Sequence, residues 1–168
     1  MTFKASLDKK TKYITAGLSV FIIGATFLPF FLEEFNKFEI GTTIILLLPI
    51  LLIPICYYYR PFSYEISSSE IIVNRLYDKV VYKQSEIKEV LLLDKKRLSN
   101  SIRSLGNEGF FGYYGSFYNK EFGDMTWYAT KTDGYVMVIF NKSKIVLTPD
   151  ETSKFIENLQ PSTSNLLP

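Results

Sequence analysis

The chain has 168 residues, of which 47% are hydrophobic, and its 19 basic and 17 acidic residues leave a formal net charge of +2. It holds no histidine and one cysteine, Cys56, which excludes a Ser/His/Asp triad, a Cys/His catalytic pair and zinc sites made of cysteine and histidine. The part after residue 60 carries thirteen basic and thirteen acidic residues, so it lacks the concentrated basic charge that nucleic-acid binding requires.

Two uncharged stretches near the start of the chain predict transmembrane helices. Residues 13–32 and residues 40–59 each contain twenty residues without a charge. As a helix, either stretch is about 30 Å long, which matches the hydrocarbon core of a bilayer. A signal peptide fits poorly, because its apolar part is shorter and no second span follows it directly. A buried helical hairpin also fits poorly, because the remaining chain is too short to enclose two wholly apolar helices.

The placement of lysine and arginine predicts the orientation of the two spans. A basic arm, residues 1–12, precedes the first span with four lysines, and Arg60 directly follows the second span. The connector between the spans, residues 33–39, has one lysine among three glutamates. By the positive-inside rule, both ends of the chain are expected in the cytoplasm and the connector outside.

After Pro61 the hydrophobic pattern changes to the period of β-strands. Residues 62–67, 70–76 and 79–83 are short β-branched and aromatic runs separated by Ser-Ser and Tyr-Asp, which predicts a meander of three antiparallel strands. Residues 87–93 predict a fourth strand. Three more follow at residues 125–131, 135–140 and 144–148, with a tight hairpin at Asp133-Gly134 and a turn at residues 141–144. Seven strands of similar length fit a small barrel or sandwich.

A helix is predicted at the end of the domain, over residues 149–159. Thr148-Pro149-Asp150-Glu151 has the form of a capping box with proline at the first helical position. The helix would place Phe155, Ile156 and Leu159 on one face, and residues 161–168 are expected to form a flexible tail.

Between the two groups of strands lies a segment of glycines and aromatic residues, residues 109–123, which we interpret as a long connection. Its rings can cover the core, lie at the bilayer surface or form a groove for a partner. We expect Phe111, Tyr114 and Trp127 to pack inward. Tyr113, Phe117 and Tyr118 are expected to be at least partly exposed and are the candidate partner-binding residues.

Two groups of charged residues are further candidates. The bases Lys95, Lys96, Arg97 and Arg103 either contact anionic headgroups or form a solvated loop balanced by nearby acids. The acids Glu108, Glu121 and Asp124 are best interpreted as solvated loop charges, although paired carboxylates are in principle able to carry chemistry. We assign no catalytic, cofactor-binding or metal-binding residue.

Glycines and aromatic residues at fixed distances from the last helix carry a resemblance to a known family. The pattern comprises Gly112-Tyr113-Tyr114-Gly115 with Phe117-Tyr118 and Gly123, then Tyr128-Ala129-Thr130, then residues 145–150 with Phe155-Ile156. Over roughly residues 64–159 the chain resembles the bacterial pleckstrin homology (PH) domain proteins of the membrane-anchored type. The resemblance implies a strongly bent antiparallel sheet whose open end is closed by a C-terminal helix, and it implies fold more than activity.

One departure from lipid-binding PH domains concerns the loop between the first two strands. Such domains hold inositol phosphates with bases around that loop, whereas here it reads Ser67-Ser68-Ser69-Glu70. The resemblance therefore does not predict phosphoinositide binding at this place.

Together these patterns predict a membrane α-helical hairpin followed by a mainly-β PH-like domain, residues 61–160, with seven antiparallel strands and a C-terminal helix. We expect a multi-pass protein of the bacterial cytoplasmic membrane that presents a binding domain for protein–protein interaction or self-assembly. The alternatives are lipid-headgroup sensing through residues 95–97, or a role as accessory subunit of a membrane enzyme or transporter. No enzymatic activity, cofactor or nucleic-acid partner is expected.

Overall fold

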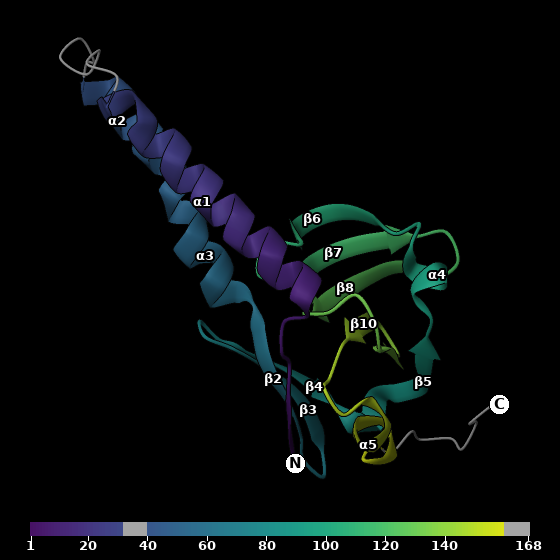
Figure 1. Ribbon diagram of the computed structural model, residues 1–168. Helices are drawn as coiled ribbons and strands as arrows, with labels where there is room; N and C mark the ends of the chain where they lie inside the picture. The colour runs from purple at the N-terminus through teal and green to yellow at the C-terminus, as the bar shows by residue number, and fades with distance from the viewer. Residues whose placement is uncertain (32–39, 160–168) are drawn as a thin grey trace.

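The computed structural model describes residues 1–31 and 40–159, which form a helical hairpin and a β domain. The hairpin projects away from the sheets, and its two helices lie side by side (Figure 1). The predicted connector, residues 33–39, and the predicted tail, residues 161–168, lie outside the described residues.

The first helix of the hairpin is α1, Lys9–Phe31, and the second is made of three consecutive pieces. These pieces are α2 (Ile40–Leu47), the 3₁₀ turn η2 (Leu48–Leu51) and α3 (Leu52–Tyr59). Pro49 accounts for the 3₁₀ turn, because proline has no N–H to donate within an α-helix. The segment Lys9–Pro29 is long and apolar enough to cross a membrane, and the apolar segment Thr43–Tyr59 is shorter.

The first sheet has four strands in the order β1-β2-β3-β4. They are β1 (Thr2–Lys4), β2 (Pro61–Ile66), β3 (Glu70–Arg75) and β4 (Lys79–Lys83). The antiparallel pairing of β2, β3 and β4 confirms the predicted meander. β1 was not predicted, because the sequence places residues 1–12 in a basic arm; instead Phe3 pairs with Tyr64 of β2 and is buried.

The second sheet has six strands in the order β5-β9-β10-β8-β7-β6. They are β5 (Ile87–Leu93), β6 (Ile102–Glu108), β7 (Tyr113–Asn119), β8 (Gly123–Ala129), β9 (Tyr135–Phe140) and β10 (Lys144–Leu147). The 3₁₀ turn η3 (Gln84–Glu86) leads into β5, and the short helix α4 (Lys95–Leu98) joins β5 to β6.

The prediction of seven antiparallel strands is wrong in three respects. The described chain has ten strands, because β1 and β6 were not predicted and the segment taken as a connection contains β7. Asp133-Gly134 does not close a tight hairpin, because β10 lies between β8 and β9. β10 pairs with β8 in parallel, with Val146 opposite Trp127, so the sheet is mixed.

Two hydrophobic clusters hold the domain together, one on each face of the six-stranded sheet. The larger cluster includes Tyr64, Ile71, Val138 and Phe155 and joins that sheet to the four-stranded one. The smaller cluster lies on the other face and is partly covered by Leu98 of α4.

The C-terminal helix is α5, Thr152–Glu157, and it is shorter than predicted. Its inward residue is Phe155, as expected, whose ring contacts Phe3 and Tyr64. The predicted capping box is wrong, because the Thr148 hydroxyl accepts hydrogen bonds from the backbone N–H groups of Thr130 and Lys131.

Candidate functional site

The turn between β6 and β7 fastens the β domain to the helical hairpin. The backbone N–H of Phe111 donates to the Thr15 hydroxyl at 2.8 Å, which joins the turn to α1. The Phe111 ring lies 5.6 Å from the Tyr57 ring of α3, centroid to centroid. The Tyr114 hydroxyl donates to the Cys56 carbonyl at 2.7 Å. The domain therefore contacts both helices at the same level, at the foot of the hairpin.

Two glycines, Gly106 of β6 and Gly115 of β7, are required by the close approach of these two strands. Gly106 and Gly115 are opposite each other, both with a left-handed φ. A Cβ on Gly115 would lie 2.3 Å from the Leu105 carbonyl oxygen. Glycine is thus needed here to let the two paired backbones approach closely, as close contacts in sheets often require.

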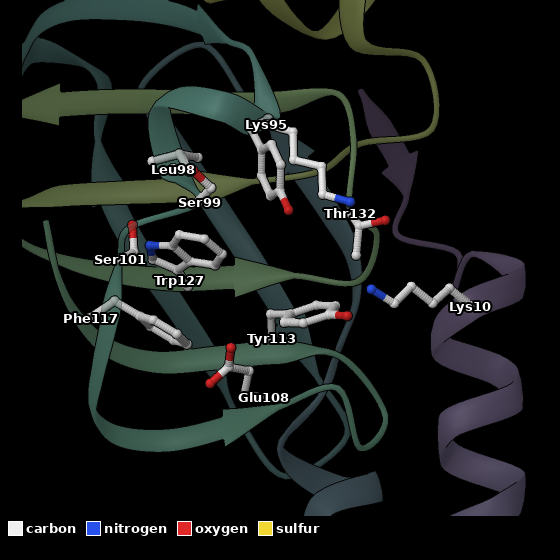
Figure 2. A pocket seen from close by; sticks show the side chains of 11 residues that line it. Lys10, Lys95, Leu98, Ser99, Ser101, Glu108, Tyr113, Phe117, Trp127 and Thr132 are labelled. Atoms are coloured by element: carbon white, nitrogen blue, oxygen red, sulfur yellow. The ribbon is translucent and has the colours of Figure 1, made fainter.

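A cavity of about 170 Å³ lies beside the foot of the hairpin, between α1, α4 and the outer face of β7 and β8 (Figure 2). We call it the hairpin-foot cavity. Its lining residues are Lys10, Lys95, Leu98, Ser99, Ser101, Glu108, Tyr113, Phe117, Trp127, Thr132 and Tyr135. The floor is aromatic, because the Phe117 and Trp127 rings stack at 4.5 Å, and the rim is polar.

The positive charge of the cavity comes from two segments that are far apart in the sequence. Figure 2 shows the ammonium groups of Lys10, from α1, and Lys95, from α4, both directed toward Thr132. Within residues 1–31 and 40–159 neither of these ammonium groups makes a hydrogen bond or an ion pair. Glu108 supplies one opposing charge from β6, at the other end of the cavity. Asp8, whose carboxylate accepts hydrogen bonds from Thr132, supplies a second opposing charge at the lysine end. Two ammonium groups outnumber this one carboxylate, so the lysine end can attract an anion.

Two tyrosine hydroxyls beside the lysines remain protonated at physiological pH. Burial raises the pKa of Tyr113, and the nearby carboxylates of Asp8 and Glu108 raise it further. Burial also raises the pKa of Tyr135, and the neighbouring Tyr113 adds to that rise. Both hydroxyls therefore keep a proton that they can donate to an anion.

One acid near the lysines is already engaged by the protein. Partial burial opposes ionisation of Asp8, but hydrogen bonds from Thr11 and Thr132 outweigh it, so the pKa of Asp8 lies below its ordinary value. The carboxylate accepts from the Thr11 N–H at 2.6 Å and from the Thr132 N–H and hydroxyl at 2.9 Å. These contacts fix the start of α1, and hence Lys10, against the loop after β8.

The indole of Trp127 leaves a donor unused at the cavity. Trp127 is 5% exposed, and its Nε1 has no hydrogen-bond partner within the described part of the chain. An unpaired buried donor costs about 1–3 kcal/mol. Figure 2 shows this nitrogen beside Ser101. It therefore faces the part of the cavity wall formed by α4 and the serines that follow it, Ser99 and Ser101.

The three predicted partner-binding residues do not form one exposed surface. Phe117 was expected to be at least partly exposed, and this is wrong: it is 2% exposed because it points into the smaller cluster and stacks on Trp127. Tyr113 is half-buried in the cavity wall, whereas Tyr118 is 45% exposed and lies outside the cavity. Of the residues expected inside, Tyr114 and Trp127 are buried and Phe111 is half-buried.

The four predicted headgroup-binding bases are also divided. Only Lys95 lines the cavity. Arg97 bonds to Glu121 and lies over the Phe122 ring at 4.9 Å, so its charge is partly satisfied. Lys96 and Arg103 are exposed and do not line the cavity.

The predicted acids do not converge either. Glu108 lines the cavity, Glu121 pairs with Arg97, and Asp124 is exposed on β8. Among the described residues, no three side chains of histidine, cysteine, aspartate or glutamate gather as a metal site would require.

Sequence reasoning missed the most informative residue of the cavity, Lys10. The sequence supports a role for Lys10 only in membrane orientation, since nothing in it connects residue 10 with residue 95. Trp127, Thr132 and Tyr135 were likewise assigned no part in binding. The only usable signal is that Lys10 lies at the start of an apolar helix, close to where that helix meets the β domain.

Comparison with known proteins identifies the domain. The family model described as Bacterial PH domain matches residues 62–162. No curated protein and no solved structure matches the chain.

Proposed function

The chain belongs to the bacterial PH domain family, and we propose that it is a binding module that its helical hairpin anchors in a membrane. The binding site is the hairpin-foot cavity, and the ligand is an anionic group at the membrane surface. The observation that carries this function is the meeting of Lys10 and Lys95, both without partners among the described residues, in one cavity. The module binds and does not catalyse.

Strand pairing supports a hairpin that crosses the membrane twice. β1 precedes α1, β2 follows α3, and the two strands are neighbours in one sheet. Strands that pair in water lie on the same side of a membrane, so a chain that leaves through α1 must return. The three pieces of the second helix, residues 40–59, have a combined rise of about 32 Å, enough for the return.

The packing of the first residues supports a retained anchor over a cleaved signal sequence. Phe3 is 5% exposed, and its ring contacts that of Phe155 at 5.1 Å. The N-terminal amine donates to the Ile66 carbonyl at 2.5 Å. Cleavage after the apolar helix would remove β1 and open this side of the core, so the segment has a structural role that a signal peptide lacks.

The bases at the foot of the hairpin support a cytoplasmic domain. Lys9, Lys10 and Lys12 begin α1, and Arg60 follows α3. Under the positive-inside rule, this end of the hairpin faces the cytoplasm. We therefore propose the cytoplasmic membrane of a bacterium as the location.

The position of the lysines favours an anionic headgroup as ligand. Lys10 lies three residues before the uncharged stretch begins at Tyr13, which is about 5 Å along the helix axis. The headgroup layer of a bilayer is about 5–7 Å thick on each side. A headgroup phosphate can therefore reach the level of Lys10, and the cavity that Lys10 lines is also lined by Lys95, Tyr113 and Tyr135. Glu108 at the far end restricts the anion to the lysine end.

A protein partner or a second copy of the chain is the second candidate. The observation in its favour is the edge strand β6, where Ile102 is 68% and Leu105 is 76% exposed, next to Tyr118 of β7. Exposed apolar residues on an unpaired edge are a common site of association. Crosslinking in native membranes, with and without Leu105→Lys, distinguishes this candidate by loss of a crosslinked product.

Cysteine labelling tests the anchor. In a Cys56→Ser chain, a cysteine replacing Asn36 of the predicted connector should react with a membrane-impermeant maleimide in intact cells. A cysteine replacing the exposed Ser104 of β6 should react only after lysis. Reaction of both sites before lysis, or of neither, would contradict a double crossing with a cytoplasmic domain.

The only tryptophan reports on the ligand, because Trp127 lines the cavity. Titration of the purified full chain with short-chain phosphatidylglycerol should change its fluorescence. Lys10→Met and Lys95→Met should each weaken binding about fivefold, since a base near an anionic surface contributes about 1 kcal/mol. Lys96→Met is the matched control and should bind like the unchanged chain. Equal affinities for all three variants would refute the cavity as the site.

A further inference from the structure

The turn between β3 and β4 exposes two large side chains in a place where small polar residues are usual. Leu76 is 52% exposed and Tyr77 is 68% exposed. Glycine, asparagine, aspartate and serine dominate such turns, because they adopt the required backbone and interact well with water. We call Leu76 and Tyr77 the β3–β4 tip. An exposed leucine and tyrosine together at a turn indicate a surface that something apolar covers.

The tip is held at the level of the last turn of α3. The Tyr77 N–H donates to the Tyr58 carbonyl at 3.2 Å, which satisfies one of the free carbonyls at the end of the helix. The Tyr77 ring lies 5.2 Å from the Tyr59 ring, centroid to centroid. Tyr58 and Tyr59 are themselves 47% and 39% exposed. The tip and the end of α3 thus form one continuous aromatic surface.

The charges beside the tip neutralise each other. The Arg75 guanidinium makes two hydrogen bonds to the Asp78 carboxylate, at 2.5 and 2.6 Å. Such bidentate pairs are among the stronger ion pairs, and they reduce the cost of bringing both charges close to an apolar medium. Arg75 also lies over the Tyr59 ring at 5.7 Å, so the pair stays directed toward the helix end.

From these contacts we infer that the β3–β4 tip inserts into the interface of the same membrane that the hairpin crosses. This inference rests on the proposed double crossing, because it takes the end of α3 as the exit from the bilayer. Tyrosine is enriched at that level, where its ring meets lipid and its hydroxyl meets water. Leu76 enters the acyl boundary beside it. The domain therefore has a second membrane contact, which sets its orientation on the bilayer.

Site-specific labelling tests the insertion in the full chain. In the Cys56→Ser background, single cysteines replace three residues in turn. These are Leu76 at the tip, Val20 of α1, which is 71% exposed, and Leu92 of β5. β5 lies on the side of the domain away from the hairpin, and Leu92 is 63% exposed, so it is a matched leucine control (Figure 1). Each cysteine carries an environment-sensitive NBD fluorophore, and the protein is reconstituted in phosphatidylethanolamine and phosphatidylglycerol vesicles.

The Leu76 label should show blue-shifted emission, quenching by lipid-attached nitroxide and protection from iodide, as the Val20 label does. The Leu92 label should remain open to iodide. If the Val20 label is in lipid while the Leu76 label behaves like Leu92, the insertion is wrong and the anchor stands. If the Val20 label is itself in water, the proposed anchor fails. A Leu76 label that is shielded from iodide but not quenched from lipid would also overturn the insertion, because protein and not lipid would then cover the tip.

Discussion

Replacing Gly115 with alanine tests whether glycine is required where the paired strands β6 and β7 approach closely. The new Cβ would lie 2.3 Å from the Leu105 carbonyl oxygen and 2.7 Å from the Gly106 Cα. Carbon atoms pack at about 3.5–4.0 Å, so β6 and β7 must separate by about 1 Å. Overpacking costs about 1–3 kcal/mol, and a φ of +119° adds about 1–2 kcal/mol for a residue with a Cβ.

We therefore expect Gly115→Ala to lower the free energy of unfolding by about 3 kcal/mol. For a domain of about 100 residues this corresponds to a fall in melting temperature of at least about 12 °C. The assay is thermal unfolding of the detergent-solubilised chain, followed through Trp127 fluorescence.

Two glycine variants calibrate the result. Gly123→Ala meets only the Lys144 ammonium at 3.8 Å, so it should cost only the backbone term, about 1–2 kcal/mol. A Cβ on Gly24 in α1 would meet no atom within 4 Å outside its own stretch of helix, so Gly24→Ala should be neutral or stabilising. An unchanged melting temperature for Gly115→Ala, or one equal to that of Gly123→Ala, would refute the steric argument.

Three other predictions concern the core, the N-terminus and pH. Phe117→Ala should lower the free energy of unfolding by about 3–5 kcal/mol, whereas Tyr118→Ala should change it by no more than about 0.5 kcal/mol; equal melting temperatures would contradict this. Phe3→Ala should destabilise the domain by about 3 kcal/mol or more, measured by the same melting assay, and a neutral result would show that β1 is dispensable. The folded-state pKa of Asp8 is depressed, so its contribution to stability is complete above its ordinary pKa of about 3.9 and is lost as the pH falls through the lower folded value. Asp8→Asn should therefore flatten the acid side of the melting-temperature curve below about pH 4, and an identical slope would contradict the linkage.

The elements that could be predicted from the sequence are those whose signal is local. The helices follow from two uncharged runs, and β2, β3 and β4 follow from β-branched residues separated by Ser-Ser and Tyr-Asp. The inward position of Phe155 follows from the helical period alone. Each of these needs information from only a short window of the chain.

The elements that could not be predicted depend on distant partners. β1 has three residues, and its partner β2 begins after the hairpin, so no local pattern marks it. β6 reads IRSLGNE and exposes most of its side chains, so its strand conformation comes from pairing with β7 and not from an apolar face. The parallel pairing of β10 with β8 could not be predicted either, because a short turn such as Asp133-Gly134 normally indicates that the two strands it joins are neighbours.

Only part of the candidate site could be predicted from the sequence, because the site also depends on residues that are far apart in the chain. Lys95 and Tyr113 were singled out by composition, but the cavity exists because α1 places Lys10 opposite them. The prediction for Phe117 is wrong because it assumes a loop, in which an aromatic side chain can remain exposed to solvent. Once residues 113–119 form a strand, alternate side chains point to opposite faces, and Phe117 and Tyr118 must separate.

In the proposed function, the construction of the cavity links ligand binding to the position of the hairpin. Lys10 belongs to α1, whereas Lys95, Tyr113 and Trp127 belong to the β domain, so a ligand that bridges them binds best at one angle between the two parts. The β6–β7 turn holds that angle through the bonds of Phe111 to Thr15 and of Tyr114 to Cys56. Linkage is reciprocal: whatever changes the tilt of the hairpin changes affinity in the cavity, and an occupied cavity resists a change of tilt. In the proposed function the hairpin therefore does more than tether the domain, because Lys10 of α1 supplies part of the proposed binding site.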